Sequence, residues 1–418
     1  MPQYAAILGH QPHISLAELA ASIPGFSLES IEAKQVALFS ASQALDGSTI
    51  DTLGGVVILA GRITEADVTM NDVPKLISGE VTKVKRKVTF GLRCFNVPKG
   101  EVRTAYRRGK EEMKRQGRPC RYIGSDKKPA ATALLRDADV VSGKKGVELF
   151  IVGTPNGLWM GKTICIQDID AYTFRDIEKP VRDTTVGLMP PKLAQILLNF
   201  GGWMVREALS DEEKKKNAAR KHKKKEIYTV LDPFCGTGVI LMECLLRGWN
   251  VEASDIAAKA VNGCKKNLDW LRKEQKILKK DVSDTVSKHD ATKAFSLKTL
   301  PDIVVTETSL GPPLNKKPKK SEIKKFVKES EKLQEAFLQS AAASLPGVPI
   351  VCTWPFWKLG DDTVQLEKVW DALTKAGYEA VLPDSIEVLD PEHPSLLYQR
   401  KDQFVGREIV LLRPVAQS

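Results

Sequence analysis

The sequence predicts an α/β protein of two or three domains, the last of them built on a doubly wound parallel sheet. Three observations indicate this class. After about residue 227, strand patterns such as Y-T-V-L-D, V-E-A-S-D and D-I-V-V-T-E alternate with helix patterns. Such alternation is typical of parallel strands joined by crossover helices. The 418 residues, 42% of them hydrophobic, are too many for one ordinary domain. The residues before 168 form separate, smaller α/β patterns.

Composition also indicates where the protein works and which cofactors it lacks. No apolar run is long enough to cross a bilayer, and the first residues lack the basic-then-apolar order of a secretory signal. Seven cysteines without a C-x-x-C pair favour reduced thiols over a disulfide framework or a zinc site. We therefore expect a soluble, cytoplasmic protein with no metal and no membrane partner.

Positive charge is concentrated in one segment of the chain. Between Lys83 and Lys145 there are 19 Lys and Arg against 6 Asp and Glu, an excess of 13, while the whole chain carries +11. Phosphate backbones bind such surfaces because each neutralised phosphate releases counterions. A solvated basic face is the plainer alternative. We favour nucleic-acid binding.

The N-terminal 62 residues predict a small α+β domain. The stretch Y-A-A-I-L-G-H-Q-P-H-I-S-L-A-E-L predicts a strand, a turn at Gln11-Pro12, and a helix capped by Ser15, with Glu18 completing a capping box. The segments V-A-L-F-S and V-V-I-L-A continue the domain as strands.

Residues 63–167 predict a second α/β unit that carries the basic segment. Its helix V-R-T-A-Y-R-R-G-K-E-E-M-K-R has an apolar face beside a stripe of cations. The apolar face consists of Val102, Tyr106, Gly109 and Met113, and the stripe consists of Arg103, Arg107, Lys110 and Lys114. We expect the first set to pack and the second to contact phosphates. Residues 210–226 are almost wholly charged and predict an insertion without a hydrophobic core. Their charge is equally compatible with RNA contact and with a solvated segment.

The segment D-P-F-C-G-T-G, residues 232–238, predicts a cofactor turn. It places Gly236 and Gly238 between a strand and a helix, where backbone N–H groups can approach a ligand. A dinucleotide fingerprint requires a third glycine where Leu241 stands. Asp255 ends the next strand, where it can accept ribose hydroxyls, and Asp290 is placed to reach an adenine amine. The ordered set favours S-adenosylmethionine over an ordinary strand-turn-helix.

These motifs resemble those of the THUMP-domain tRNA guanosine N2-methyltransferases that modify position ten. Three further segments are similar to segments of this family: M-P-P-K-L-A-Q, which contains Pro191, the N-terminal stretch quoted above, and the closing Y-Q-R-K-D-Q-F-V-G-R-E-I-V-L-L. The resemblance implies an N-terminal ferredoxin-like domain (1–62), a THUMP RNA-binding domain (63–167) and a Rossmann-like class I methyltransferase domain (168–418), with tRNA as the partner. The residues assigned to the cofactor are Asp232, Phe234, Gly236, Gly238, Asp255, Asp290 and Pro191. Some relatives need a small activating subunit, and the sequence leaves that open.

The catalytic loop departs from the family pattern. Amino methyltransferases carry D-P-P-Y or N-P-P-Y, whose acceptor oxygens bind the amine and whose aromatic ring stacks on the flipped base. Here the strand ends at Glu307, followed by Thr308-Ser309-Leu310-Gly311, without an aromatic residue. Glu307 is the candidate catalytic residue. Trp354 and Phe356 are more consistent with core packing than with base stacking.

Two alternatives stay open at the level of the sequence. The altered loop also suits a tRNA-binding protein that keeps the methyltransferase fold without turnover. An amino methyltransferase acting on another base is the weaker alternative.

Overall fold

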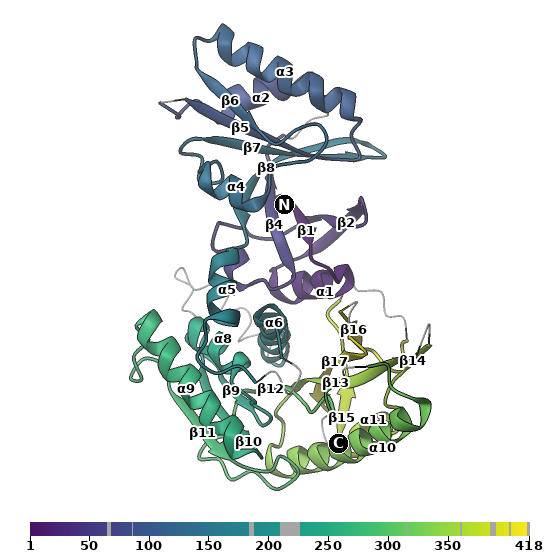
Figure 1. Ribbon diagram of the computed structural model, residues 1–418. Helices are drawn as coiled ribbons and strands as arrows, with labels where there is room; N and C mark the ends of the chain where they lie inside the picture. The colour runs from purple at the N-terminus through teal and green to yellow at the C-terminus, as the bar shows by residue number, and fades with distance from the viewer. Residues whose placement is uncertain are drawn as a thin grey trace. The chain divides into compact units, whose positions relative to one another are not determined.

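The computed structural model describes residues 1–64, 68–85, 87–183, 188–209, 226–314, 316–359, 362–384, 390–400 and 403–415. The predicted insertion at 210–226 therefore lies outside the described residues except for Glu226. The chain divides into two compact units, Met1–Asp170 and Ala171–Ser418. Helix α5 (Ile169–Ile177) contains the point of division. Each unit has its own sheet, which confirms the α/β class (Figure 1).

Unit 1 is built on one sheet of eight strands in the order β2-β3-β1-β4-β8-β7-β5-β6. The strands are β1 (Gln3–Leu8), β2 (Ser27–Glu32), β3 (Val36–Ser40), β4 (Val56–Arg62), β5 (Val88–Phe95), β6 (Cys120–Ile123), β7 (Gly146–Thr154) and β8 (Gly157–Ile166). The helices are α1 (Pro12–Ser22), the 3-10 helix η1 (Thr49–Thr52), α2 (Val73–Glu80), α3 (Lys99–Arg115) and α4 (Thr132–Asp137). The pairing of β4 with β8 makes the sheet continuous across the predicted boundary at residue 62.

Helix α1 begins at Pro12, so the capping box predicted at Ser15 is wrong. Proline suits the first helical position because its φ is fixed and its missing N–H is not needed there. Glu18, fully buried, instead accepts the N–H groups of Gly54 and Gly55, each at 2.7 Å. The carboxylate thus fixes the loop before β4 rather than the start of its own helix.

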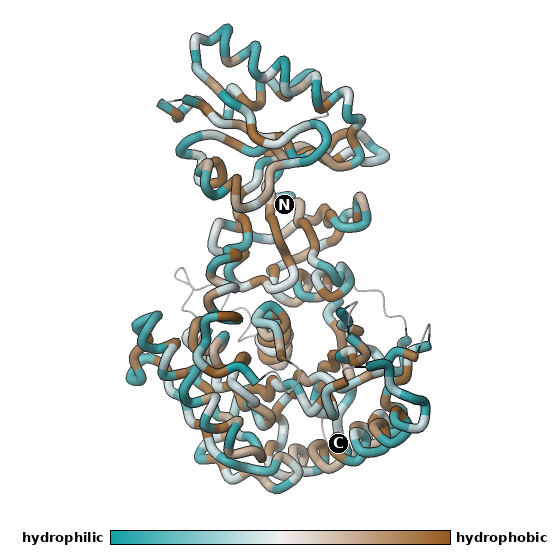
Figure 2. Tube along the Cα trace, viewed as in Figure 1, coloured by the Kyte–Doolittle hydropathy of each residue, from teal (hydrophilic) through white to brown (hydrophobic). Residues whose placement is uncertain are grey.

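Helix α3 confirms the predicted division into two faces. The four predicted apolar-face residues are all buried and belong to the packed side of the helix. The helix is largely hydrophilic along its trace (Figure 2). One side of it packs on α2 and the sheet while the cationic side stays in solvent.

Unit 2 has a nine-stranded sheet whose main path runs β11-β10-β9-β12-β13-β17-β15. The strands are β9 (Thr229–Asp232), β10 (Asn250–Asp255), β11 (Asp284–Lys288), β12 (Ile303–Glu307), β13 (Ile350–Leu359), β14 (Asp362–Val364), β15 (Tyr378–Ala380), β16 (Leu396–Tyr398) and β17 (Val405–Pro414). The helices are α6 (Pro191–Glu207), α8 (Val239–Arg247), α9 (Ala258–Gln275), α10 (Lys320–Ser344) and α11 (Lys368–Lys375).

The first five strands along this path, from β11 to β13, are parallel, as the alternation predicted. Strand β17 runs antiparallel to β13 and β15. The order of the parallel strands is that of a Rossmann-like sheet, in which the chain reverses direction across the sheet between β9 and β12. Among the described residues no helix is long and apolar enough to cross a membrane, and no group of three or more potential metal ligands occurs.

Candidate functional site

Three neighbouring strands of unit 2 end in acidic residues at the same edge of the sheet. Asp232 ends β9, Asp255 ends β10 and Glu307 ends β12. Strand β9 lies between the other two (Figure 1). Because the strands are parallel, their carboxyl ends meet where the strand order reverses, the usual ligand site of open α/β sheets.

The glycine turn between β9 and α8 has the backbone that the sequence predicted. Gly236 and Gly238 have φ values of +51° and +88°, which favour glycine. Gly238 is the N-cap of α8, and Gly248 ends that helix in the same left-handed region. The carboxylate of Asp255 accepts the N–H of Gly236 at 3.0 Å. The turn is therefore held by the acid that ends the next strand.

Asn267 is a second support of this turn, and sequence reasoning missed it. Its amide, fully buried on α9, donates to the carbonyl oxygens of Thr237 (2.8 Å) and Val181 (3.0 Å). Its oxygen accepts the N–H of Val181 at 2.9 Å. One side chain thus joins the glycine turn to the segment before α6. No spacing in the sequence signals a contact between residues 86 positions apart.

Asp232 is buried directly behind the turn. It is 2% exposed and accepts hydrogen bonds from Thr306 Oγ1 (2.6 Å) and from the N–H of Phe234 (3.2 Å). Burial is the main cause that raises the pKa of Asp232, to about 7. The hydrogen bonds from Thr306 and Phe234 oppose this rise, and the nearby carboxylates of Asp255 and Glu307 add to it. The bond to Thr306 ties the glycine turn to the strand that ends at Glu307.

We expect Asp232 to make folding stability depend on pH. Because its folded pKa of about 7 lies above the usual 3.8, its stabilising contribution is full below pH 3.8 and is lost as pH rises through 7. Between pH 5 and pH 8 this group should lower the free energy of unfolding by about 3 kcal/mol. The free energy of unfolding is measured in urea without ligand at several pH values. In the variant Asp232→Asn it should lack this part of the decrease with pH. Identical slopes in the two proteins would contradict the account.

Glu307 is paired with a buried arginine. Its Oε1 accepts the Nε–H of Arg407 at 2.5 Å, and the two side chains are 14% and 2% exposed. The next residue, Thr308, is fixed by donating to the carbonyl oxygen of Thr353 (2.6 Å) and by accepting from Gln334 (2.7 Å). Glu307 is thus presented by an anchored strand end, whereas Ser309–Gly311 are exposed or half-buried.

The aromatic residues near this loop do not replace the missing stacking ring. Trp354 and Phe356 are 0% and 1% exposed, which confirms the prediction of core packing. Phe234, in the glycine turn, is half-buried and packs edge-on against Phe337 with ring centroids 5.3 Å apart. Among the described residues we therefore assign no base-stacking ring to the Glu307 loop.

Two other predicted cofactor residues lie on neighbouring segments. Pro191 is buried at the first position of α6. Asp290 follows β11, and its Oδ1 accepts the backbone N–H (3.0 Å) and the hydroxyl (2.7 Å) of Thr292. These bonds lower the pKa of Asp290 and keep it ionised at neutral pH.

In unit 1 the predicted cationic stripe lines a cavity of about 420 Å³ between α3 and the segment that includes Tyr122, Ser125 and Asp126. Arg103 pairs with Asp126 and Arg107 pairs with Glu111, each at 2.8 Å. Within the described part of the chain, Lys110 and Lys114 form no ion pair. Two of the four predicted cations are therefore partly neutralised. The cavity is also lined by Tyr106, Tyr122 and Ser125, of which Tyr122 is 46% exposed.

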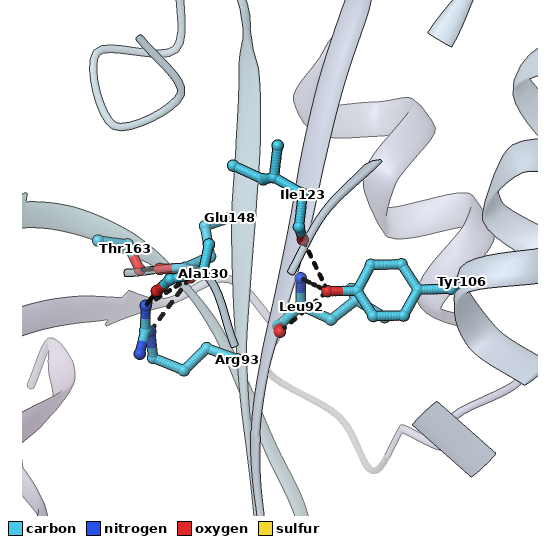
Figure 3. Close-up of polar contacts among 7 residues, drawn as sticks. All are labelled: Leu92, Arg93, Tyr106, Ile123, Ala130, Glu148 and Thr163. Carbon is cyan, nitrogen blue, oxygen red and sulfur yellow. Dashed lines mark hydrogen bonds and ion pairs between the residues drawn. The ribbon is translucent and has the colours of Figure 1, made fainter. Parts of the chain in front are cut away.

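Two separate sets of buried polar contacts fix the segment between Ile123 and Ala130 (Figure 3). The hydroxyl of Tyr106, on α3, donates to the carbonyl oxygen of Ile123 at 2.9 Å. Arg93 pairs with Glu148 at 3.0 Å and donates to the carbonyl oxygen of Ala130 at 2.5 Å. Burial raises the pKa of Glu148, and the Arg93 charge opposes that change. The segment from Ile123 to Ala130 is thus fixed at both ends beside the basic helix.

The fold and the site define a Rossmann-like α/β unit with a glycine turn and an acidic strand end, preceded by a basic α/β unit. A family model described as conserved hypothetical protein 95 matches residues 205–338, which include the turn and Glu307. The chain is 28% identical over 167 residues to a tRNA (guanine(10)-N2)-dimethyltransferase of Methanothermobacter thermautotrophicus, which confirms the resemblance seen in the sequence. The match covers 40% of this chain and 38% of that relative.

Two crystal structures resemble the chain over its whole length at low identity. TrmN from Thermus thermophilus has 14% identity and a TM-score of 0.48, over 99% of this chain and 100% of that one. A possible methylase from Clostridium difficile 630 has 10% identity and a TM-score of 0.46, over 100% and 99%.

Proposed function

We propose that this protein is an S-adenosylmethionine-dependent methyltransferase that methylates the exocyclic N2 amine of a guanosine, at position ten, in cytoplasmic tRNA. The observation that carries the proposal is the joining of the glycine turn to the candidate catalytic acid. The Asp232–Thr306 hydrogen bond of 2.6 Å holds the turn beside the strand end that bears Glu307. A methyl donor and an amine acceptor must meet in this way.

The residues present fit the cofactor. Apart from Gly236 and its two neighbours in the chain, no described residue lies within 4 Å of the place where a Cβ on Gly236 would stand, so the turn is open to a ligand. Helix α8 begins at Val239, directly after its N-cap Gly238, and a helix N-terminus offers unpaired backbone N–H groups to a ligand. Each oxygen of Asp255 accepts one backbone N–H, from Gly236 or from Ala257, and keeps a second lone pair for a ribose hydroxyl. Asp290 would accept the adenine amine through Oδ2.

The chemistry asks little of the protein beyond orientation and one proton acceptor. When bound, S-adenosylmethionine would supply an electrophilic methyl group to the N2 nitrogen, and its sulfur would keep the electron pair of the broken S–C bond as a neutral thioether. The amine must then lose one proton, and the carboxylate of Glu307 is placed to accept it. The second amine hydrogen would be accepted by a backbone carbonyl oxygen of the loop after Glu307.

Unit 1 would supply affinity for tRNA. Residues 1–62 would form the ferredoxin-like domain and 63–167 the THUMP domain, with 168–418 as the methyltransferase domain. Lys110 and Lys114, supported by Arg103 and Arg107, would contact phosphates. The excess of 13 positive charges between Lys83 and Lys145 supports this assignment.

Alanine substitutions at the two glycines of the turn distinguish an effect on cofactor binding from an effect on packing within the chain. A Cβ on Gly238 would stand 2.6 Å from Sγ of Cys264, whereas one on Gly236 meets open space. Both variants carry the cost of a positive φ, about 1–2 kcal/mol. Gly238→Ala should therefore lower the melting temperature more, while Gly236→Ala should weaken cofactor binding in calorimetry although it remains folded. Unchanged cofactor affinity in Gly236→Ala would contradict the assignment of the turn.

The test of the proposed function is methyl transfer itself. Purified protein is incubated with methyl-labelled S-adenosylmethionine and unmodified total tRNA, and the digested nucleosides are identified by mass spectrometry. Label in N2-methylguanosine or N2,N2-dimethylguanosine is the expected result. Label in another nucleoside would support action on another base.

A tRNA-binding protein without turnover is the second candidate. The core positions of Trp354 and Phe356 favour it, because they leave the Glu307 loop without a stacking ring. It predicts tRNA binding with a steep salt dependence and no label under any condition. That outcome would overturn the enzymatic proposal.

A further inference from the structure

Arg407 is the only charged partner of Glu307 among the described residues, and it comes from a distant part of the chain. It lies on β17, which pairs antiparallel with β13 and places Arg407 opposite Pro355. Its side chain is 2% exposed, so the guanidinium is withdrawn from water. A buried arginine of this kind is retained only where its donors are bound.

Three groups fix the orientation of this guanidinium. Nε donates to Glu307 Oε1 at 2.5 Å, and Nη2 donates to the carbonyl oxygen of Leu188 at 3.4 Å, just before α6. The guanidinium carbon lies 5.9 Å from the ring centroid of Tyr398, on the neighbouring strand β16. Because the planar guanidinium of Arg407 is bound by these three groups, it holds the carboxylate of Glu307 in one orientation.

The pairing uses only one oxygen of the carboxylate. Within the described part of the chain, Oε2 of Glu307 accepts no hydrogen bond, and the side chain is 14% exposed. Glutamate has one more rotatable bond than aspartate and loses orientation unless a partner holds it. Arg407 removes that freedom by fixing Oε1, which leaves Oε2 as the oxygen available to a substrate.

We propose that Arg407 is a positioning residue for methyl transfer, and that it compensates for the additional methylene of Glu307. This inference rests on the proposed function of the same site. In the usual loop, the shorter aspartate needs no side-chain partner to keep its acceptor oxygen in place. Here Glu307 needs the ion pair with Arg407 to fix that oxygen. Arg407 itself contacts no substrate and acts only through the carboxylate.

The first test replaces Arg407 and measures kcat, KM and binding separately. Arg407→Met should lower kcat by roughly 10²-fold, because the acceptor oxygen is no longer fixed, while cofactor affinity stays within about threefold. Arg407→Lys should recover part of kcat. The matched control is Arg413→Met. Arg413 lies on β17 like Arg407, and the substitution removes its exposed ion pair with Glu379 of β15 and should leave kcat unchanged.

The second test leaves Arg407 in place and shortens its partner, and thermal unfolding is measured to establish that the variant is folded. Glu307→Asp restores the shorter acid, but its carboxylate no longer reaches Arg407. We expect kcat to fall by at least about tenfold. A Glu307→Asp variant as active as the unsubstituted protein would overturn the inference.

A double variant distinguishes positioning from a general loss of structure. If Arg407 acts through Glu307, then Glu307→Gln combined with Arg407→Lys should be no slower than Glu307→Gln alone. Additive losses would overturn the inference. So would a folded Arg407→Met protein with unchanged kcat, although methyl transfer by the unsubstituted protein would still support the proposed function. Absence of transfer by the unsubstituted protein would overturn both.

Discussion

Replacing Glu307 by Gln should lower the rate of methyl transfer by roughly 10²–10⁴-fold, the usual contribution of a positioned proton acceptor. The amide keeps the size of the side chain and one acceptor oxygen, but it cannot take the amine proton. Cofactor affinity should be nearly unchanged, because Glu307 lies on β12 and the turn belongs to β9 and α8. Rates are measured by label incorporation into tRNA, and affinity by calorimetry.

The matched control for this substitution is Glu379→Gln. Glu379 also pairs with an arginine of β17, Arg413, but it is exposed and belongs to the edge strand β15. It should retain the full rate. If Glu307→Gln retains turnover, Glu307 has no part in the mechanism.

Reversing two lysine charges on α3 should weaken tRNA binding by roughly 10- to 100-fold near physiological salt. Lys110 and Lys114 line the cavity beside Tyr122, and within the described part of the chain neither is paired with an acid. The variant Lys110→Glu with Lys114→Glu should also show a shallower dependence of affinity on salt, because fewer counterions are released on binding. Filter binding at several salt concentrations measures both quantities.

The control for this pair is Lys279→Glu with Lys280→Glu. These exposed lysines precede β11, at the edge of the sheet opposite the strand ends that form the site. The control changes net charge equally but should bind tRNA as the unsubstituted protein does. Equal losses in both variants would show that overall charge, and not the α3 face, determines affinity.

Local patterns were sufficient to predict much of this molecule. The parallel strands, the glycine turn, the acids at three strand ends and the two faces of α3 each follow from a few neighbouring residues. The error at Ser15 arose locally as well, because Pro12 starts the helix before the predicted cap. Periodicity and turn chemistry therefore predict elements better than their ends.

The supports of the site were not predictable in the same way. Arg407 meets Glu307 across 100 residues, and Asn267 meets Val181 across 86. Such contacts depend on strand order and on the antiparallel insertion of β17, which no local pattern encodes. The closing stretch was recognised only as similar to family segments, and nothing in its spacing distinguished Arg407 from the arginines around it.

The most direct measurement compares two transcripts of one tRNA that differ at a single atom group. One carries guanosine at position ten and the other carries inosine, which lacks the exocyclic N2 amine. The account predicts label from S-adenosylmethionine on the guanosine transcript, recovered as a methylated N2 amine at position ten, and none on the inosine transcript. Equal labelling of both transcripts, or of neither, would contradict it.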